Sequence, residues 1–215
     1  SPDRAWSRAR FVRAAGHLEA MVSPSPYDRR FRAPRQTLND FLAAMLRQRA
    51  HRPRSAVNGS AWRGDVEPVG YIFDSGRLLK ESGLDADVGD APDALNVRSH
   101  DIVLRQLSVS PPLAGAHMHF HGSVLNSLVV GTRRWALVPP SLAEFSLDVP
   151  AIHRFGELRH GGRAHGATAI GSKSRHQPPW LDCIQRAGDV LWLPPQWGHA
   201  TLSLSDAVSV ALEHV

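Results

Sequence analysis

Three histidines, His117, His119 and His121, alternate along the stretch HMHFHG. In a β-strand, residues two apart point to the same face, so these three imidazoles are expected to share one face. Imidazole is a common ligand for iron, zinc, copper and nickel. Two of the three can bind one metal ion, and a further ligand must come from another strand. We expect it to be His199, which opens an alternating run after a Pro-Pro turn in GDVLWLPPQWGHATLSL.

A carboxylate that could join these histidines is not apparent in the sequence. The candidate acids stand outside the expected metal strands, at a turn, or at least seven residues beyond His199; they are Asp101, Glu144, Asp189, Asp206 and Glu213. If His121 is itself a ligand, its second ring nitrogen needs a hydrogen-bond acceptor that fixes its tautomer. The sequence therefore predicts a metal site built from histidine alone.

Short β-rich runs separated by turn residues position these histidines. The runs are VGYIFDS, HDIVLRQLSVS, AHMHFHG, LNSLVVGTRRWALVPP, LDCIQRAGDVLWLPP and HATLSLSDAVSVALEHV. Such spacing is typical of a sandwich or barrel, and a double-stranded jelly roll brings distant strands together around a pocket. We expect a mainly β fold, with the histidine face pointing inward. Residues 1 to about 50 look helical, and the second helix is expected to begin at Thr37 or Asn39.

The chain divides into two predicted parts. Residues 1–65 are expected to be a helical and loop extension that packs on the core, and residues 66–215 the jelly-roll domain. Residues 156–179 are rich in Gly, His and Arg with little apolar content, which predicts a mobile surface insertion. Because the chain starts without methionine, we expect it to be part of a longer protein.

Composition narrows the class of protein. The chain has 215 residues, 42% of them hydrophobic, with no apolar run long enough to cross a membrane. A single cysteine, Cys183, excludes an internal disulfide framework and a cysteine-based zinc site. The net charge of +5 is carried almost wholly by scattered arginines. No aromatic stacking platform accompanies them, so nucleic acid is a weakly supported partner.

Three segments resemble the JmjC-domain family of cupin-like jelly rolls, in particular its small JmjC-only members. They are GYIFDSGRLL, HFHGSVLNSLVVGTRRWALVPP and LDCIQRAGDVLWLPPQWGHATLSLSDAVSVAL, which together fall within about residues 66–213. The resemblance implies an oxygenase that depends on Fe(II) and 2-oxoglutarate and hydroxylates a protein side chain. It implies no catalytic residue beyond the metal ligands.

Matched to the family's motif, the ligands become His119, His121 and His199. His121 occupies the position where the family has Asp or Glu, so the ligand set is neutral. Zinc or nickel is then expected to substitute for iron in the purified protein. A second register, with His117 and His119 as the pair, stays open.

The expected co-substrate pocket also departs from the family pattern. Arg133, in GTRRW, stands where the family usually has Lys, and it can pair with the distal carboxylate of 2-oxoglutarate. A surface arginine in a turn is the alternative reading. Asn126 matches an inward-facing Asn of the family that touches the co-substrate. Ala116 stands where many members have Thr.

Two further functions remain open beside the 2-oxoglutarate oxygenase. One is a catalytically inactive or altered JmjC module that keeps the metal pocket for structural or protein-binding use. The other is a cupin dioxygenase that uses three histidines without 2-oxoglutarate. By resemblance the location is the lumen of the endoplasmic reticulum, with cytoplasm or nucleus as alternatives. The sequence does not specify the substrate or the oligomeric state.

Overall fold

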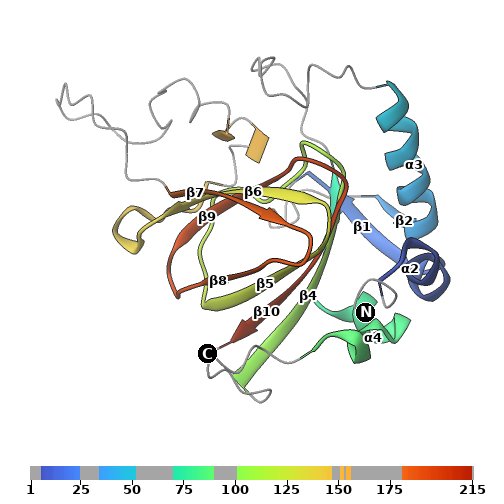
Figure 1. Ribbon diagram of the computed structural model, residues 1–215, viewed down its shortest axis with the longest axis horizontal. Helices are drawn as coiled ribbons and strands as arrows, with labels where there is room; N and C mark the ends of the chain where they lie inside the picture. Colours follow the sequence, from blue (N-terminus) through green and yellow to red (C-terminus); the bar gives the residue numbers. More distant parts are fainter. Residues whose placement is uncertain are drawn as a thin grey trace.

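Two antiparallel β-sheets face each other in the computed structural model and helices flank one side (Figure 1). The described residues are 6–24, 34–51, 70–89, 101–146, 151–152, 154–155 and 181–214. This architecture confirms the predicted jelly-roll fold. The insertion predicted at 156–179 lies outside the described residues, and the division at residue 65 stays a prediction.

The larger sheet has seven strands in the order β2-β1-β3-β4-β10-β5-β8. Their bounds are β1 Glu19–Ser23, β2 Arg35–Thr37, β3 Tyr71–Asp74, β4 Ile102–Ser110, β5 Ser123–Val130, β8 Val190–Leu193 and β10 Ala207–His214. Strand β10 pairs with β4 on one side and β5 on the other, so it lies inside the sheet and not at an edge.

The smaller sheet has three strands in the order β7-β6-β9. Their bounds are β6 Thr132–Val138, β7 Leu181–Arg186 and β9 Gly198–Ser203. Strands β5 and β6 belong to different sheets and are joined by Gly131 alone, whose φ of +93° suits glycine. A Cβ at this position would lie 2.1 Å from the carbonyl oxygen of Asp206, so the tight corner requires the bare backbone.

Three helices lie beside the larger sheet: α2 Arg8–Ala15, α3 Leu38–His51 and α4 Arg77–Ser82. Thr37 caps the start of α3, as predicted, because its hydroxyl accepts a hydrogen bond from the Asp40 amide at 3.1 Å and donates to the Asp40 carboxylate at 2.8 Å. The sequence predicted a helical N-terminal region, but the structure also shows two strands there. Strands β1 and β2 pair with each other, and β1 joins the larger sheet through β3. Both strands are too short to give a clear alternation of apolar and polar residues in the sequence.

Alternation along β4 and β10 separates two environments. Apolar residues of one face pack against the helices in the main core, which includes Phe11, Leu38, Phe41, Leu78, Leu107, Val109, Val210 and Leu212. The opposite face carries Ser108, Ser110 and Ser209, which are buried between the two sheets. The larger sheet therefore turns polar side chains into the jelly roll, while its outer face is apolar and covered by helices.

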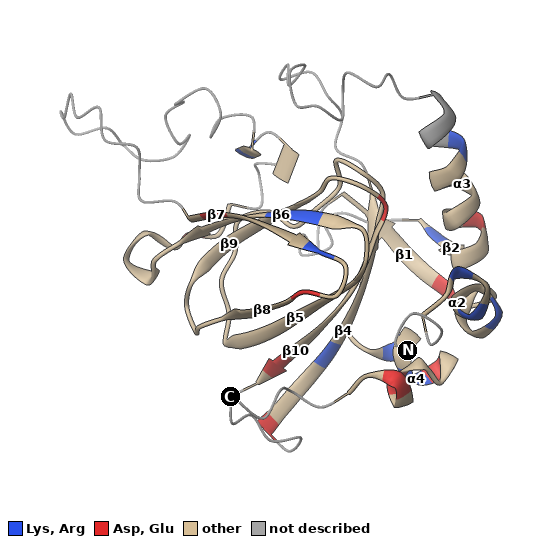
Figure 2. Cartoon of the chain, viewed as in Figure 1, with Lys and Arg blue, Asp and Glu red and all other residues tan. Residues whose placement is uncertain are grey.

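Two properties of the described part of the chain bear on its class. No helix among them is long and apolar enough to cross a membrane. Basic and acidic residues are intermixed over helices and strands, rather than gathered in one basic stripe on the described part of the chain (Figure 2). This distribution lends no support to a nucleic-acid partner.

Candidate metal centre

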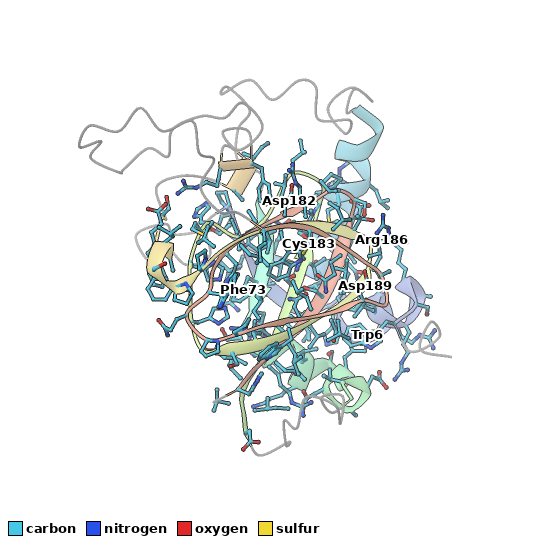
Figure 3. The ribbon with its side chains drawn as sticks, turned by 60° about the vertical axis from the view of Figure 1, so that its left-hand side comes forward. Trp6, Phe73, Asp182, Cys183, Arg186 and Asp189 are labelled. Carbon is cyan, nitrogen blue, oxygen red and sulfur yellow. The ribbon has the colours of Figure 1, made fainter. Side chains whose placement is uncertain are left out.

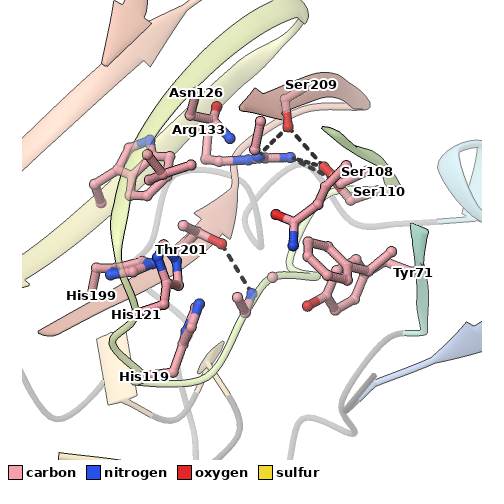
Figure 4. Close-up of a pocket in the computed structure, with 17 residues that line it drawn as sticks. Tyr71, Ser108, Ser110, His119, His121, Asn126, Arg133, His199, Thr201 and Ser209 are labelled. Atoms are coloured by element: carbon pink, nitrogen blue, oxygen red, sulfur yellow. Dashed lines mark hydrogen bonds between the residues drawn. The ribbon is translucent and has the colours of Figure 1, made fainter. Parts of the chain in front are cut away.

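His119, His121 and His199 come together at one end of the interior pocket (Figure 4). Each offers one ring nitrogen, and these three nitrogens all lie within 4.8 Å of one another. The ring centroids of His119 and His199 are 4.1 Å apart, and those of His121 and His199 are 4.7 Å apart. Among the described residues, no carboxylate or thiol joins this cluster.

The same nitrogen of each ring is already engaged by the backbone. The Nδ1 atoms of His119, His121 and His199 lie 2.7, 2.9 and 3.0 Å from the carbonyl oxygens of His117, Gly122 and Trp197. A carbonyl oxygen only accepts, so each Nδ1 carries the proton and each Nε2 keeps its lone pair. All three rings therefore hold the tautomer that presents Nε2 to a metal ion.

Burial keeps two of these imidazoles neutral. His119 and His199 are each 4% exposed. Desolvation lowers the pKa of His119 to about 4, with a smaller contribution from the neighbouring histidines. Desolvation also lowers the pKa of His199 well below its usual value. Metal ligation requires neutral imidazole, so both rings are in the right protonation state at neutral pH.

A pair of backbone hydrogen bonds fixes the first and third histidines. The amide of His119 donates to the carbonyl of His199 at 3.0 Å, and the amide of His199 donates back at 2.8 Å. This isolated bridge places the HMHFH stretch beside the start of β9. His199 is thus a neighbour of His119 in an adjacent extended segment.

The expectation that His117, His119 and His121 share one strand face was wrong. The stretch is extended but bends at Met118, so it forms no regular strand and the alternation is broken. His117 is buried at 3% exposure and does not join the cluster. Its carbonyl instead orients the ring of His119. The geometry therefore favours the register with His119 and His121 over the one with His117.

Arg133 lies in the same pocket, on β6, and is 5% exposed. Its guanidinium reaches across to the larger sheet, where Nη1 donates to Ser209 at 2.7 Å and Nη2 to Ser108 at 2.9 Å. A longer contact of 3.4 Å joins Nη2 to Ser110. The reading of Arg133 as a surface turn residue is wrong, because the second position of β6 points inward.

Asn126, on β5, also lines the pocket and is 6% exposed. Its buried side-chain oxygen has no hydrogen-bond partner among the described residues. A buried acceptor of this kind is costly unless a ligand or water supplies a donor. We therefore expect a ligand or a water molecule to donate a hydrogen bond to Asn126 in this pocket.

Several pocket residues were not identified from the sequence. They are Tyr71, Ser108, Ser110, Thr201 and Ser209. The hydroxyl of Thr201 accepts a hydrogen bond from the amide of Ala116 at 3.0 Å, so a threonine on β9 places a hydroxyl beside Ala116. The available signal was serine alternating with apolar residues in LSVS and VSV. That pattern is ordinarily read as a solvent-facing side.

Cys183 takes no part in this centre. It lies on β7, an edge strand of the smaller sheet (Figure 3). Burial raises the pKa of its thiol, and the nearby Asp182 adds to this effect. A thiol that resists deprotonation is a poor metal ligand.

The chain is similar to several JmjC proteins, although no protein-family model matches it. Human JmjC domain-containing protein 8 is 33% identical over 98 residues, which cover 46% of this chain and 33% of the human protein. The bifunctional arginine demethylase and lysyl-hydroxylase psr-1 of Caenorhabditis briggsae is 28% identical over 119 residues, covering 51% of this chain and 29% of that protein. The 2-oxoglutarate and iron-dependent oxygenase JMJD4 of Gallus gallus is 27% identical over 109 residues, covering 45% and 23%.

A solved structure shows the same fold. The ribosomal oxygenase YcfD of Escherichia coli aligns with 98% of this chain and 44% of its own, at a TM-score of 0.51 and 14% identity. The chain spans about a third or less of the length of these curated relatives. The fold and the matches together confirm the resemblance to the JmjC-domain family. Relatives within that family include iron- and 2-oxoglutarate-dependent oxygenases.

Proposed function

We propose that this chain is a JmjC-type oxygenase that binds Fe(II) through His119, His121 and His199, uses 2-oxoglutarate, and hydroxylates a protein side chain. The observation that carries the proposal is the convergence of three imidazoles, all held by backbone carbonyls in one tautomer. Such an arrangement leaves three lone pairs close together, and a hydrogen bond from the other ring nitrogen to a backbone carbonyl is usual for histidines that bind a metal ion.

The donor set fits a divalent transition-metal ion. Imidazole suits iron, zinc, copper and nickel, and three ligands leave positions open for other molecules. When bound, the iron supplies oxygen activation at those open positions. The protein's own part is to orient the three rings through their Nδ1–H bonds and to exclude water with the buried walls of β5, β6 and β9.

The rest of the pocket fits a small dicarboxylate. Arg133 is a fixed cation in the same cavity as the histidines, and its planar fork suits a carboxylate. Asn126 also lines the cavity, and its amide nitrogen is the atom that can donate to a carboxylate, because its side-chain oxygen only accepts. In this proposal Arg133 orients the distal carboxylate of 2-oxoglutarate, and Asn126 lies along the bound molecule.

His121 favours a second candidate function. A histidine in the carboxylate position removes one negative charge from the ligand set, and this change supports an altered or inactive JmjC module that keeps its metal pocket. It also supports a cupin dioxygenase that works without 2-oxoglutarate. The endoplasmic reticulum lumen and a protein substrate remain part of the proposal by resemblance alone.

Anaerobic titration separates these functions. The metal-free protein is given one equivalent of Fe(II) and then 2-oxoglutarate, while visible absorption is followed. We expect a metal-to-ligand charge-transfer band that saturates with 2-oxoglutarate, and slow release of carbon dioxide when oxygen is admitted.

The matched control is His119→Ala, which should show neither the band nor decarboxylation. Fe(II) binding without the band would favour the altered module or the dioxygenase that does not use 2-oxoglutarate. Absence of Fe(II) binding to the unmodified protein would exclude the proposed oxygenase outright.

A further inference from the structure

Two separate sets of backbone hydrogen bonds position the three histidines. The bridge between His119 and His199 fixes two of them to each other. His121 is not part of that bridge. The carbonyl of Gly122 orients its ring, and the turn between β8 and β9 holds its backbone.

Adjacent residues of that turn reach two of the histidines. The amide of Gln196 donates to the carbonyl of His121 at 2.8 Å. The carbonyl of the next residue, Trp197, accepts from Nδ1 of His199 at 3.0 Å. The geometry of this one peptide segment therefore sets the position of His121 relative to His199.

Gln196 adopts an unusual backbone conformation to do so. Its φ is +65°, and Leu113 is the other non-glycine residue with positive φ among the described residues. Pro195 precedes Gln196 in a turn, which resembles the arrangement of a type II β-turn, where glycine is preferred at the third position. Residues with a Cβ rarely occupy this region, and β-branched residues are the least tolerated.

The side chain of Gln196 is exposed and does not line the pocket. Its contact with the centre is made by the amide alone. A role for this residue must then depend on backbone conformation rather than on the chemistry of its carboxamide.

We propose that Gln196 is a positioning residue, whose left-handed backbone holds His121 in register with His199 so that all three Nε2 atoms meet at one ion. The inference rests on the proposed metal-binding role of the three histidines. It assigns to the Pro195–Gln196–Trp197 turn the task of bringing in the ligand that replaces the family's carboxylate.

Cobalt titration of turn variants tests this role. Co(II) affinity and the Co(II) ligand-field spectrum are measured for the unmodified protein, Gln196→Gly and Gln196→Val. Glycine accepts positive φ and keeps the amide, so its affinity should stay within about twofold and its spectrum unchanged. Valine resists this conformation, so the Co(II) affinity of Gln196→Val should fall by about tenfold or more and its spectrum should change. Losses of this size are typical when a residue that supports a metal ligand is replaced.

Leu113→Val is the matched control, because Leu113 has φ of +72° and its amide donates to Ser203 rather than to a histidine. It should lower the melting temperature of the metal-free protein while leaving Co(II) affinity unchanged. Equal loss of affinity in Leu113→Val and Gln196→Val would overturn the inference, since strain alone would then explain both. Loss of affinity in Gln196→Gly would also overturn it, because the side chain would be the active part.

Amide hydrogen exchange gives a second measurement that needs no variant. The Gln196 amide should be protected in the metal-free protein, and more so with Co(II) bound. Rapid exchange that Co(II) does not alter contradicts the proposal even if Gln196→Val does not fold. Unmodified protein that binds no Co(II) would refute the metal site itself, whereas normal binding by a folded Gln196→Val would refute only the role of the turn.

Discussion

Three imidazole side chains define the chemistry at the scale of single residues. A ligand set of two histidines and a carboxylate removes one unit of the metal's charge, whereas His119, His121 and His199 remove none. Because imidazole affinity for divalent ions rises along the first transition series to copper, Zn(II), Ni(II) and Cu(II) should outcompete Fe(II) in the purified protein. Iron loading must therefore be done anaerobically and with the other metals excluded.

Substitution of the ligands should abolish metal binding. His119→Ala and His199→Ala each remove one of three lone pairs and leave a cavity among buried residues, so stoichiometric metal should be lost in both. His17→Ala is the control, because His17 is exposed on the surface and lies outside the cluster. Metal content is measured by elemental analysis after dialysis. Equal metal content in all three variants would refute the ligand assignment.

His121→Asp should restore the family's usual ligand charge. If the chain is an impaired 2-oxoglutarate oxygenase, this variant should prefer Fe(II) more strongly and decarboxylate 2-oxoglutarate faster than the unmodified protein. If three histidines are native to its activity, the same change should lower turnover. Metal competition and carbon dioxide release measure both effects. Should neither quantity change, His121 is not a ligand and the His117–His119 register must be adopted.

Acid should destabilise the metal-free protein through its buried histidines. Unfolded His119 takes up a proton below about pH 6.5, whereas burial lowers the folded-state pKa to about 4. The unfolded state thus binds more protons between these values, so the free energy of unfolding falls as pH drops through this window. From about pH 7 to about pH 5, His119 alone contributes roughly 2 kcal/mol of loss.

Urea unfolding in the presence of a chelator measures this change. His199, whose pKa is shifted in the same direction, should add to the slope. His119→Gln removes one titrating group and should flatten the dependence on pH, while His17→Gln should not. A slope in His119→Gln equal to that of the unmodified protein would show that His119 does not titrate in this way.

At the scale of elements, strand periodicity predicted what lies on regular strands and failed elsewhere. Alternation and turn residues in the runs from Ile102 to His214 were enough to predict the jelly roll, and the start of β9 after a Pro-Pro turn identified His199. The bend at Met118 was not predictable, because it depends on the hydrogen bonds that this stretch makes to β9. Periodicity therefore grouped His117 wrongly with the other two histidines.

Arg133 is a second residue whose orientation strand periodicity did not determine. The sequence left two readings open, a partner for the co-substrate's distal carboxylate and a surface residue in a turn, and its burial on β6, where it pairs with Ser203 of β9, shows that it points inward. Two of the serines that accept its hydrogen bonds, Ser108 and Ser209, lie 2.8 Å apart and bond to each other, and the third, Ser110, bonds to Ser203 at 2.7 Å. Contacts between strands this far apart in the chain leave no local pattern to read.

Replacement of Arg133 should separate co-substrate binding from metal binding. Arg133→Met keeps the volume but removes the cation, and the serine pairs can still satisfy one another, so the fold and the metal site should persist. Loss of a charge-assisted bond of about 1.5–3 kcal/mol predicts 2-oxoglutarate binding weaker by roughly 10- to 100-fold. Arg133→Lys should recover part of this loss.

Isothermal titration of the metal-loaded variants checks the prediction. Metal affinity serves as the internal control, since Arg133 makes no contact with the three histidines in the proposed scheme. Unchanged 2-oxoglutarate affinity in Arg133→Met would remove Arg133 from the co-substrate site.

At the scale of the whole molecule, the outer and inner faces of the larger sheet contact different surroundings. Outside, the larger sheet is covered by α2, α3 and α4 over an apolar core. Inside, the two sheets enclose serines, an asparagine, an arginine and three histidines in one pocket. The polar groups in this pocket take the place of apolar side chains that would stabilise the fold by packing. Such a departure is expected where the interior serves to bind a ligand.

X-ray absorption spectroscopy of the zinc-loaded protein tests the central claim most directly. The account predicts three imidazole nitrogens at about 2.0–2.1 Å from zinc, and two in His121→Asp, in which a carboxylate takes the place of the third. Fewer than three imidazoles in the unmodified protein, or the same number in His121→Asp, would contradict a centre formed by His119, His121 and His199.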